Sequence, residues 1–204
     1  EELARNGSET GIGLSLYQEV GAATGEARLK IFRVGPPLSL SQVLPVLTTM
    51  GAEVVDERPY ELDDLDRSSY VYDFGLRYRG GLPEQARELF QDTVLAVWDG
   101  RNETDGFNAL VLAVGITWRQ ALMLRAYAKH MQQGGSPFAQ ASIEDALRIN
   151  VDITRLLVKL FEAKFSITAG DPAEHGTLCE QLQTKILRAL EEVTSLDHDR
   201  ILRS

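Results

Sequence analysis

The sequence predicts an α+β fold, with a ferredoxin-like βαββα sheet module followed by an all-helical module. Two observations lead to this prediction. In the first half of the 204 residues, apolar and polar side chains mostly alternate with the period of two that is typical of strands. From Asp105 onward, the apolar side chains recur only at helical spacings. We therefore expect a sheet domain at residues 14–104 and a helical domain at residues 105–204, each near the usual size of a domain.

The first two strands are expected near the start of the chain. Residues 1–13 are polar, include three glycines and are expected to be a linker or a frayed end. Residues 14–20 and 27–34 alternate between apolar and polar side chains, with a glycine-flanked turn between them. The sequence Gly35-Pro36-Pro37 ends the second strand, because proline cannot donate a hydrogen bond to a neighbouring strand.

A helix is predicted after this loop, because four apolar residues recur at positions i, i+3, i+4 and i+7. Ser39 or Ser41 supplies its N-cap, and Gly51 ends it. Since Pro45 is tolerated only near the first turn, we expect Ser41 to be the N-cap. The apolar residues are Val43, Val46, Leu47 and Met50.

Two more strands and a second helix complete the predicted sheet module. The strands are expected at residues 53–60 and 70–78, and Pro83 opens a helix that ends at Gly100. A strand–helix–strand unit is parallel and right-handed, and the two strands that follow the first helix form a hairpin. We therefore expect a split βαβ sheet with both helices on one face.

The second half is expected to contain about five helices. Residues 117–120 form a capping-box pattern at the start of one of them. Ser195 is expected to cap the last helix, which has only about two turns and would be marginal in isolation. Because the chain also begins at Glu1 rather than Met, we expect it to be a segment of a longer polypeptide.

The charge distribution argues against nucleic acid and anionic membranes as partners. The 21 basic and 30 acidic residues give a net charge of −9. Residues 1–100 contribute 9 basic and 17 acidic side chains, and residues 101–204 contribute 12 and 13, so neither half offers a basic footprint. A single cysteine can form no internal disulfide, so a reducing, cytoplasmic setting is expected.

The motifs of common active sites are missing from the sequence. The nearest approach to a dinucleotide-binding fingerprint, at residues 11–16, lacks the third glycine and precedes a strand instead of following one. His175 and Cys179 have the i, i+4 spacing of metal ligands, but no second pair of ligands accompanies them. We therefore expect no catalytic, cofactor-binding or metal-binding residue in this segment.

Several blocks of sequence resemble the non-catalytic region of the very large bacterial NAD-specific glutamate dehydrogenases. The resemblance runs in order from about residue 14 to the end of the chain. The blocks are residues 29–35 (LKIFRVG), 37–47 (PLSLSQVLPVL), 55–61 (VDERPYE), 105–112 (DGFNALVL), 117–120 (TWRQ), 124–129 (LRAYAK) and 195–203 (SLDHDRILR).

The resemblance implies a function for the parent enzyme, which would deaminate L-glutamate oxidatively to 2-oxoglutarate and ammonia and pass a hydride to NAD. It also implies that the catalytic lysine and the NAD-binding domain lie C-terminal to this segment. The sheet module would then be an ACT-like domain, and the segment would bind no cofactor itself. Expected partners are other domains of the same chain and other subunits of a homo-oligomer.

Two surfaces are candidates for a functional role, one from the resemblance and one from the pattern of apolar residues. In amino-acid-binding ACT domains, the loop between the first strand and the first helix holds the effector. The corresponding loop of this chain would bind it through Gly35, Leu38, Ser39 and Ser41. Two prolines, however, remove backbone donors from this loop. Apolar residues on both faces of the second strand suggest an interface. We expect a role in subunit assembly; the alternatives are allosteric sensing of an amino acid and a free-standing interaction module. The candidate interface residues are Leu29, Ile31, Phe32 and Val34.

Overall fold

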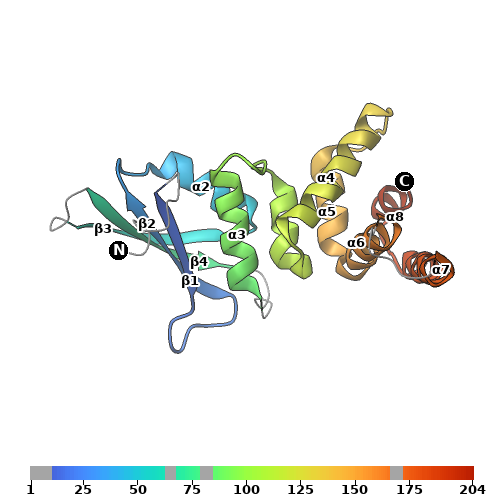
Figure 1. Ribbon diagram of the computed structural model, residues 1–204, viewed down its shortest axis with the longest axis horizontal. Coiled ribbons are helices and arrows are strands. Elements are labelled where there is room, and N and C mark those ends of the chain that lie inside the picture. Colours follow the sequence, from blue (N-terminus) through green and yellow to red (C-terminus); the bar gives the residue numbers. More distant parts are fainter. Residues whose placement is uncertain (1–10, 63–67, 79–84, 166–171) are drawn as a thin grey trace. The chain divides into compact units, whose positions relative to one another are not determined.

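The structure, a computed structural model, describes residues 11–62, 68–78, 85–165 and 172–204 (Figure 1). Its contacts divide the chain into two compact units, Glu1–Trp118 and Arg119–Ser204. The first unit contains the sheet and the second is helical. Among the helices so described, none combines the length and apolar composition needed to cross a bilayer.

The first unit contains a four-stranded antiparallel sheet in the order β1-β2-β4-β3. The strands are β1 (Ile12–Tyr17), β2 (Glu26–Val34), β3 (Glu53–Leu62) and β4 (Ser69–Arg77). Because β2 and β3 are both antiparallel to β4 and flank it, they run parallel to each other with one strand between them. This is the split βαβ arrangement that the sequence predicts, and β1 extends it at the free edge of β2.

The strand β1 begins earlier than expected and includes part of the predicted linker. Ile12 pairs with Arg33 and is buried, and Gly13 continues the strand. The Val34 N–H donates to the carbonyl oxygen of Gly11 at 2.9 Å, so the hairpin pairing continues to that residue. The linker assignment is therefore wrong for Ile12 and Gly13, while residues 1–10 lie outside the described part of the chain.

The helix α2 (Leu40–Thr49) contains the predicted apolar stripe, but Ser39 is its N-cap and Ser41 lies inside it. The prediction of Ser41 is therefore wrong. The Ser39 N–H donates to Gln42 Oε1 at 3.1 Å, and this reciprocal capping contact fixes the start one turn before Pro45. The proline then stands within the helix, where it has no N–H to donate to the i−4 carbonyl oxygen.

The helices α2 and α3 (Ala86–Trp98) cover one face of the sheet (Figure 1). The core lies between this face and the two helices. The expected start of α3 at Pro83 lies outside the described residues, and the helix ends before Gly100, as predicted. Core side chains with no more than 2% exposure include Leu29, Ile31, Leu47, Phe74, Leu76 and Phe90.

Two short helical segments follow α3 and pack against α2 and α3. They are the 3-10 helix η1 (Gly106–Asn108) and the π-helical turn η2 (Val111–Gly115). The side chain of Asp105 caps the first by accepting a hydrogen bond from the Phe107 N–H at 3.1 Å. Because Phe107, Val111 and Val114 are buried there, these segments belong to the first compact unit, which ends at Trp118, later than the expected boundary at residue 104.

In the described part of the second unit there are five helices, in agreement with the helical periodicity of its sequence. Ser195 caps the last one, as expected, by accepting a hydrogen bond from the His198 N–H at 3.3 Å. A core of Ile153, Ile186 and Leu190 joins two of the helices. The five are α4 (Trp118–Gln133), α5 (Gln140–Ile149), α6 (Val151–Phe165), α7 (Pro172–Leu190) and α8 (Leu196–Arg203).

Candidate functional site

One row of residues crosses all four strands on the sheet face that α2 and α3 leave open. Tyr17 of β1 lies opposite Arg28 of β2, which lies opposite Gly75 of β4, which lies opposite Asp56 of β3. Leu29, the neighbour of Arg28, is fully buried in the core. Since successive side chains of a strand point to opposite faces, the whole row projects away from the helices.

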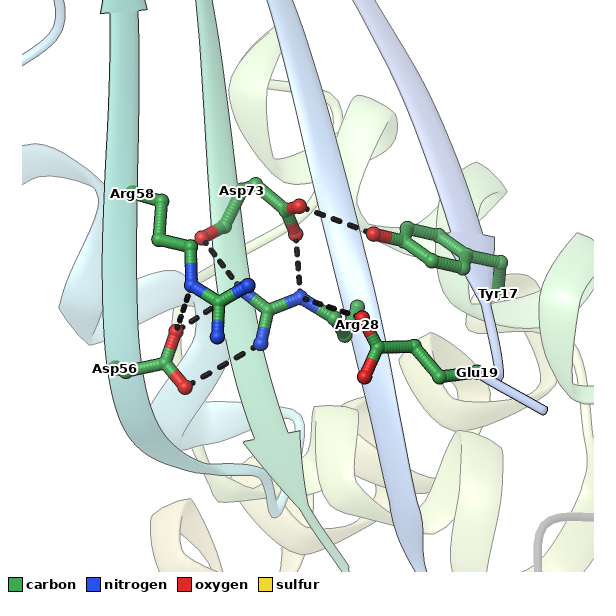
Figure 2. A network of polar contacts seen from close by, with 6 residues as sticks. All are labelled: Tyr17, Glu19, Arg28, Asp56, Arg58 and Asp73. Atoms are coloured by element: carbon green, nitrogen blue, oxygen red, sulfur yellow. Dashed lines mark hydrogen bonds and ion pairs between the residues drawn. The ribbon is translucent and has the colours of Figure 1, made fainter. Parts of the chain in front are cut away.

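Arg28 is the centre of a polar network on this open face (Figure 2). Its Nε donates to Asp73 Oδ1 at 2.9 Å, and its Nη2 donates to the Asp73 carbonyl oxygen at 3.2 Å. Its Nη2 and Nη1 reach the two carboxylate oxygens of Asp56 at 2.9 and 3.3 Å. The guanidinium of Arg28 therefore binds Asp56 in the bidentate geometry that suits a carboxylate, and it joins three strands.

Three further side chains complete the network. The Tyr17 hydroxyl donates to Asp73 Oδ2 at 3.0 Å and so adds the fourth strand. Glu19 lies 3.9 Å from Arg28 Nε, and Arg58 Nε lies 3.7 Å from Asp56 Oδ1 (Figure 2). The network thus holds three carboxylates, two guanidinium groups and one phenol that contact one another.

Two features of the backbone make room for this network. A Cβ atom on Gly75 would lie 2.6 Å from Asp56 Oδ2 and 3.2 Å from Arg28 Nη1, so the glycine leaves room for the guanidinium and the carboxylate where they meet over β4. Val54 pairs with Leu76 whereas Asp56 pairs with Gly75, so Val55 is an extra residue in β3. This bulge turns Asp56 onto the open face, toward Arg28.

Burial makes the central ion pair energetically important. Arg28 is 7% exposed and Asp73 is 6% exposed, although both are charged. The hydrogen bonds that Arg28 donates to Asp56 raise the pKa of Arg28 above its ordinary value, and they lower the pKa of Asp56. Both shifts favour the ionised forms, so the Arg28–Asp56 pair is charged at neutral pH.

A pocket of about 360 Å³ adjoins the network. Its three acidic and three basic side chains leave no net charge that would select a simple anion or cation. They are Glu19, Glu26, Arg28, Asp56, Arg58 and Arg77.

The other end of the open face is apolar, and we call it the docking patch. Phe32, Val71 and Tyr60 form one cross-strand row there, and Val34 and Leu62 flank Ser69 in the next row. Tyr60 is 51% exposed and Leu62 is 43% exposed, while Phe32, Val34 and Val71 are half-buried. The docking patch consists of Phe32, Val34, Tyr60, Leu62 and Val71.

Comparison with known proteins identifies both units. Residues 11–89 match the family model of the glutamate dehydrogenase ACT3 domain, and residues 102–167 match that of glutamate dehydrogenase helical motif 3. The chain belongs to the NAD-specific glutamate dehydrogenase family. This confirms the resemblance and the ACT-like nature of the sheet module.

Individual relatives agree with the two family models. The NAD-specific glutamate dehydrogenases of Halomonas elongata and Pseudomonas aeruginosa are each 36% identical over 198 residues, covering 94% and 93% of this chain. The Mycobacterium tuberculosis enzyme of the same name is 37% identical over 190 residues, or 88% of the chain. In each case the chain spans only 12% of the length of the relative.

In the ACT3 domain, the expected effector loop leads into α2, and three of its N–H groups donate hydrogen bonds within the domain. Gly35 N–H donates to the Ser68 carbonyl oxygen and Leu38 N–H donates to the Tyr72 hydroxyl, both at 2.9 Å. Ser39 N–H donates to Gln42, and the Ser39 hydroxyl lies 2.9 Å from that of Ser41. These contacts stabilise the loop itself.

The four candidate interface residues of the glutamate dehydrogenase segment separate onto two faces. Leu29 and Ile31 are buried beneath the helices and cannot reach a partner. Phe32 and Val34 belong to the docking patch.

His175 lies against the Ala163 carbonyl oxygen, and the described residues include no cluster of three or more ligands suited to a metal ion.

The arginine network was not anticipated from the sequence. Arg28 and Asp73 occupy the polar positions of alternating strands, which is what an ordinary solvent-exposed face also shows. Gly75 inside a predicted strand was the available signal, because a strand glycine often marks close approach of another group.

Proposed function

We propose that this chain is a non-catalytic structural segment that serves subunit assembly in an NAD-dependent glutamate dehydrogenase. The parent enzyme would convert L-glutamate, NAD and water to 2-oxoglutarate, ammonia and NADH with residues outside this segment. The observation that supports the assembly role is the open face of the sheet, where an apolar docking patch adjoins a closed network of paired charges.

The arginine network gives the patch a firm support. It joins β1, β2, β3 and β4 at one end of the face through hydrogen bonds from Arg28 and Tyr17. Its polar groups pair with one another, which is the arrangement of a structural brace. The apolar side chains at the other end therefore form a fixed surface, and covering them by another subunit would remove apolar area from water.

The assembly role can be tested with two exposed apolar residues of the full-length enzyme. Tyr60→Asp introduces a charge into the docking patch, and Val20→Asp introduces the same charge in the exposed β1–β2 turn. We expect sedimentation to show weaker subunit association for Tyr60→Asp and unchanged association for Val20→Asp. Equal association of both variants and the wild type would contradict the proposal.

An activity assay tests the non-catalytic assignment separately. We expect the full-length chain to reduce NAD in the presence of L-glutamate and the 204-residue chain to show no turnover. Turnover by the 204-residue chain would overturn this part of the proposal.

A panel of amino acids distinguishes assembly from effector sensing. Under the assembly role, no amino acid raises the unfolding temperature of the 204-residue chain. A bound effector at a hundred times its Kd would stabilise the chain by about 2.7 kcal/mol, which thermal unfolding detects easily.

A further inference from the structure

The helical unit contains an apolar groove of about 390 Å³, lined by residues of α4, α5, α6 and α8. We call it the helical groove. The two long helices α4 and α6 supply most of its lining. Their central contributions are Met123, Tyr127 and Met131 from α4 and Leu157, Phe161 and Phe165 from α6.

The spacing of these residues shows the form of the groove. On each helix they recur every four residues, so they form a stripe along one side. At 1.5 Å per residue, each stripe extends over about 12 Å, or roughly two helical turns. A stripe of this length is long enough to contact the i, i+3, i+4 and i+7 anchors of an amphipathic helix lying in the groove.

The helix α6 has more apolar surface than α7 covers. Ile153 packs against Ile186 and Leu190 of α7 in the core of the unit. Phe165 is nevertheless 62% exposed at the groove, and Tyr127 across from it is 49% exposed. The ring of Phe161 contacts both, with centroid distances of 6.0 Å to Tyr127 and 4.7 Å to Phe165. The exposed aromatic residues therefore form a connected surface.

The chemistry of the lining is that of a protein interface. Two of the three methionines of the chain lie in the groove, and methionine adapts its shape to an apolar partner. Aromatic residues and methionine are also the residue types enriched at interface cores. The groove residues that can carry a positive charge are His130 and Lys164, and none of its lining side chains is a carboxylate. A partner with an apolar stripe and acidic flanks would complement it.

We propose that the helical groove binds an amphipathic helix of the same polypeptide that lies outside residues 1–204. The chain covers only 12% of the length of its relatives, so most of such a polypeptide lies outside this segment. A helix of the same chain is present at high effective concentration and needs no separate encounter. The groove and the docking patch lie in different units and share no residue, so this proposal stands independently of the assembly role.

Photo-cross-linking in the full-length enzyme tests the proposal. Tyr127 is replaced by a photoreactive phenylalanine analogue, and the cross-linked peptides are identified by mass spectrometry. Assembling isotopically light and heavy subunits together separates cross-links within one polypeptide from those between subunits. We expect an intrachain cross-link to one segment outside residues 1–204 with apolar residues at i, i+3 or i+4, and i+7.

Two matched substitutions make the test specific. Phe165→Asp places a carboxylate in the groove, whereas Leu187→Asp places one on α7 at a residue of similar exposure, 58% against 62%, outside the groove. We expect Phe165→Asp to lower the cross-link yield at least about tenfold, which corresponds to about 1.4 kcal/mol, and Leu187→Asp to leave it unchanged. Cross-links found only between subunits would overturn the proposal. So would the absence of any cross-link if an apolar small molecule were found bound in the groove instead.

Discussion

The guanidinium of Arg28 crosses β4 directly over Gly75, where an added side chain would crowd it. A Cβ atom there would lie 3.2 Å from Arg28 Nη1 and 2.6 Å from Asp56 Oδ2. Arg28 and Asp56 come from the strands on either side of β4, so the glycine lets an ion pair bridge two strands that do not pair with each other. The ACT3 domain thus contains a polar brace whose geometry depends on one small residue.

We expect Gly75→Ala to destabilise the protein by about 1–3 kcal/mol, the usual effect of an added methyl group in a well-packed site. The new methyl group displaces the Asp56 carboxylate from Arg28. Gly176→Ala is the matched control, because it adds the same group in the open on α7 and favours the helix by about 0.5–1 kcal/mol. Urea unfolding of both variants measures the two effects, and destabilisation by both would contradict this account.

We expect Arg28→Met to lower the free energy of unfolding by about 3–5 kcal/mol, because it leaves the buried Asp73 without its cation. Arg28→Lys should have a smaller effect, since lysine keeps the charge but loses the bidentate geometry. Replacing Arg28 and Asp73 together by apolar residues should restore part of the loss. A double-mutant cycle by chemical denaturation measures the coupling, and additive effects would show that the pair is not coupled.

The depressed pKa of Asp56 predicts a pH dependence with a definite sign. Because the folded pKa lies below the ordinary value of 3.8, the Asp56 carboxylate stabilises the folded state fully at pH values above 3.8. This contribution is lost as the pH falls through the folded pKa. The stability difference between the wild type and Asp56→Asn should therefore be largest near neutral pH and should shrink in acid. A difference that grows in acid would contradict the assignment.

Tyr72 lies in β4 and Tyr78 directly follows that strand. Removing the hydroxyl group of each should change the stability of the protein in opposite directions. The Tyr78 hydroxyl is buried, has no hydrogen-bond partner among the described residues, and has its pKa raised by burial. We expect Tyr78→Phe to stabilise the protein by about 1 kcal/mol, because it removes an unpaired polar group while keeping the ring contact with Phe90.

Tyr72 provides the contrast, since its hydroxyl accepts the Leu38 N–H at 2.9 Å. Tyr72→Phe should destabilise the protein by about 1–3 kcal/mol, because that N–H loses its partner. Thermal and urea unfolding of the two variants test both signs. If both substitutions changed the free energy of unfolding in the same direction, the hydrogen bonding of these two hydroxyl groups would not explain the stability of the variants.

Much of the fold was predictable because its signals are local. The stripe of α2 follows from the 3.6-residue period of a helix, and the alternation in β2 follows from the two-residue period of a strand. The order of these elements, together with the handedness rule, led to the split βαβ sheet. The N-cap of α2 was predicted at the wrong serine, because the side chain of Gln42 decides between Ser39 and Ser41.

By itself, the sequence determined the order of elements, the fold class and the family of this chain, since each depends on residue types and spacings along the backbone. Only the tertiary structure decided the arginine network. Arg28 and Asp73 lie 45 positions apart, and Val55 shifts the register of β3 so that Asp56 reaches the same face. Strand pairing and the bulge bring these residues together, and neither leaves a signature in local periodicity.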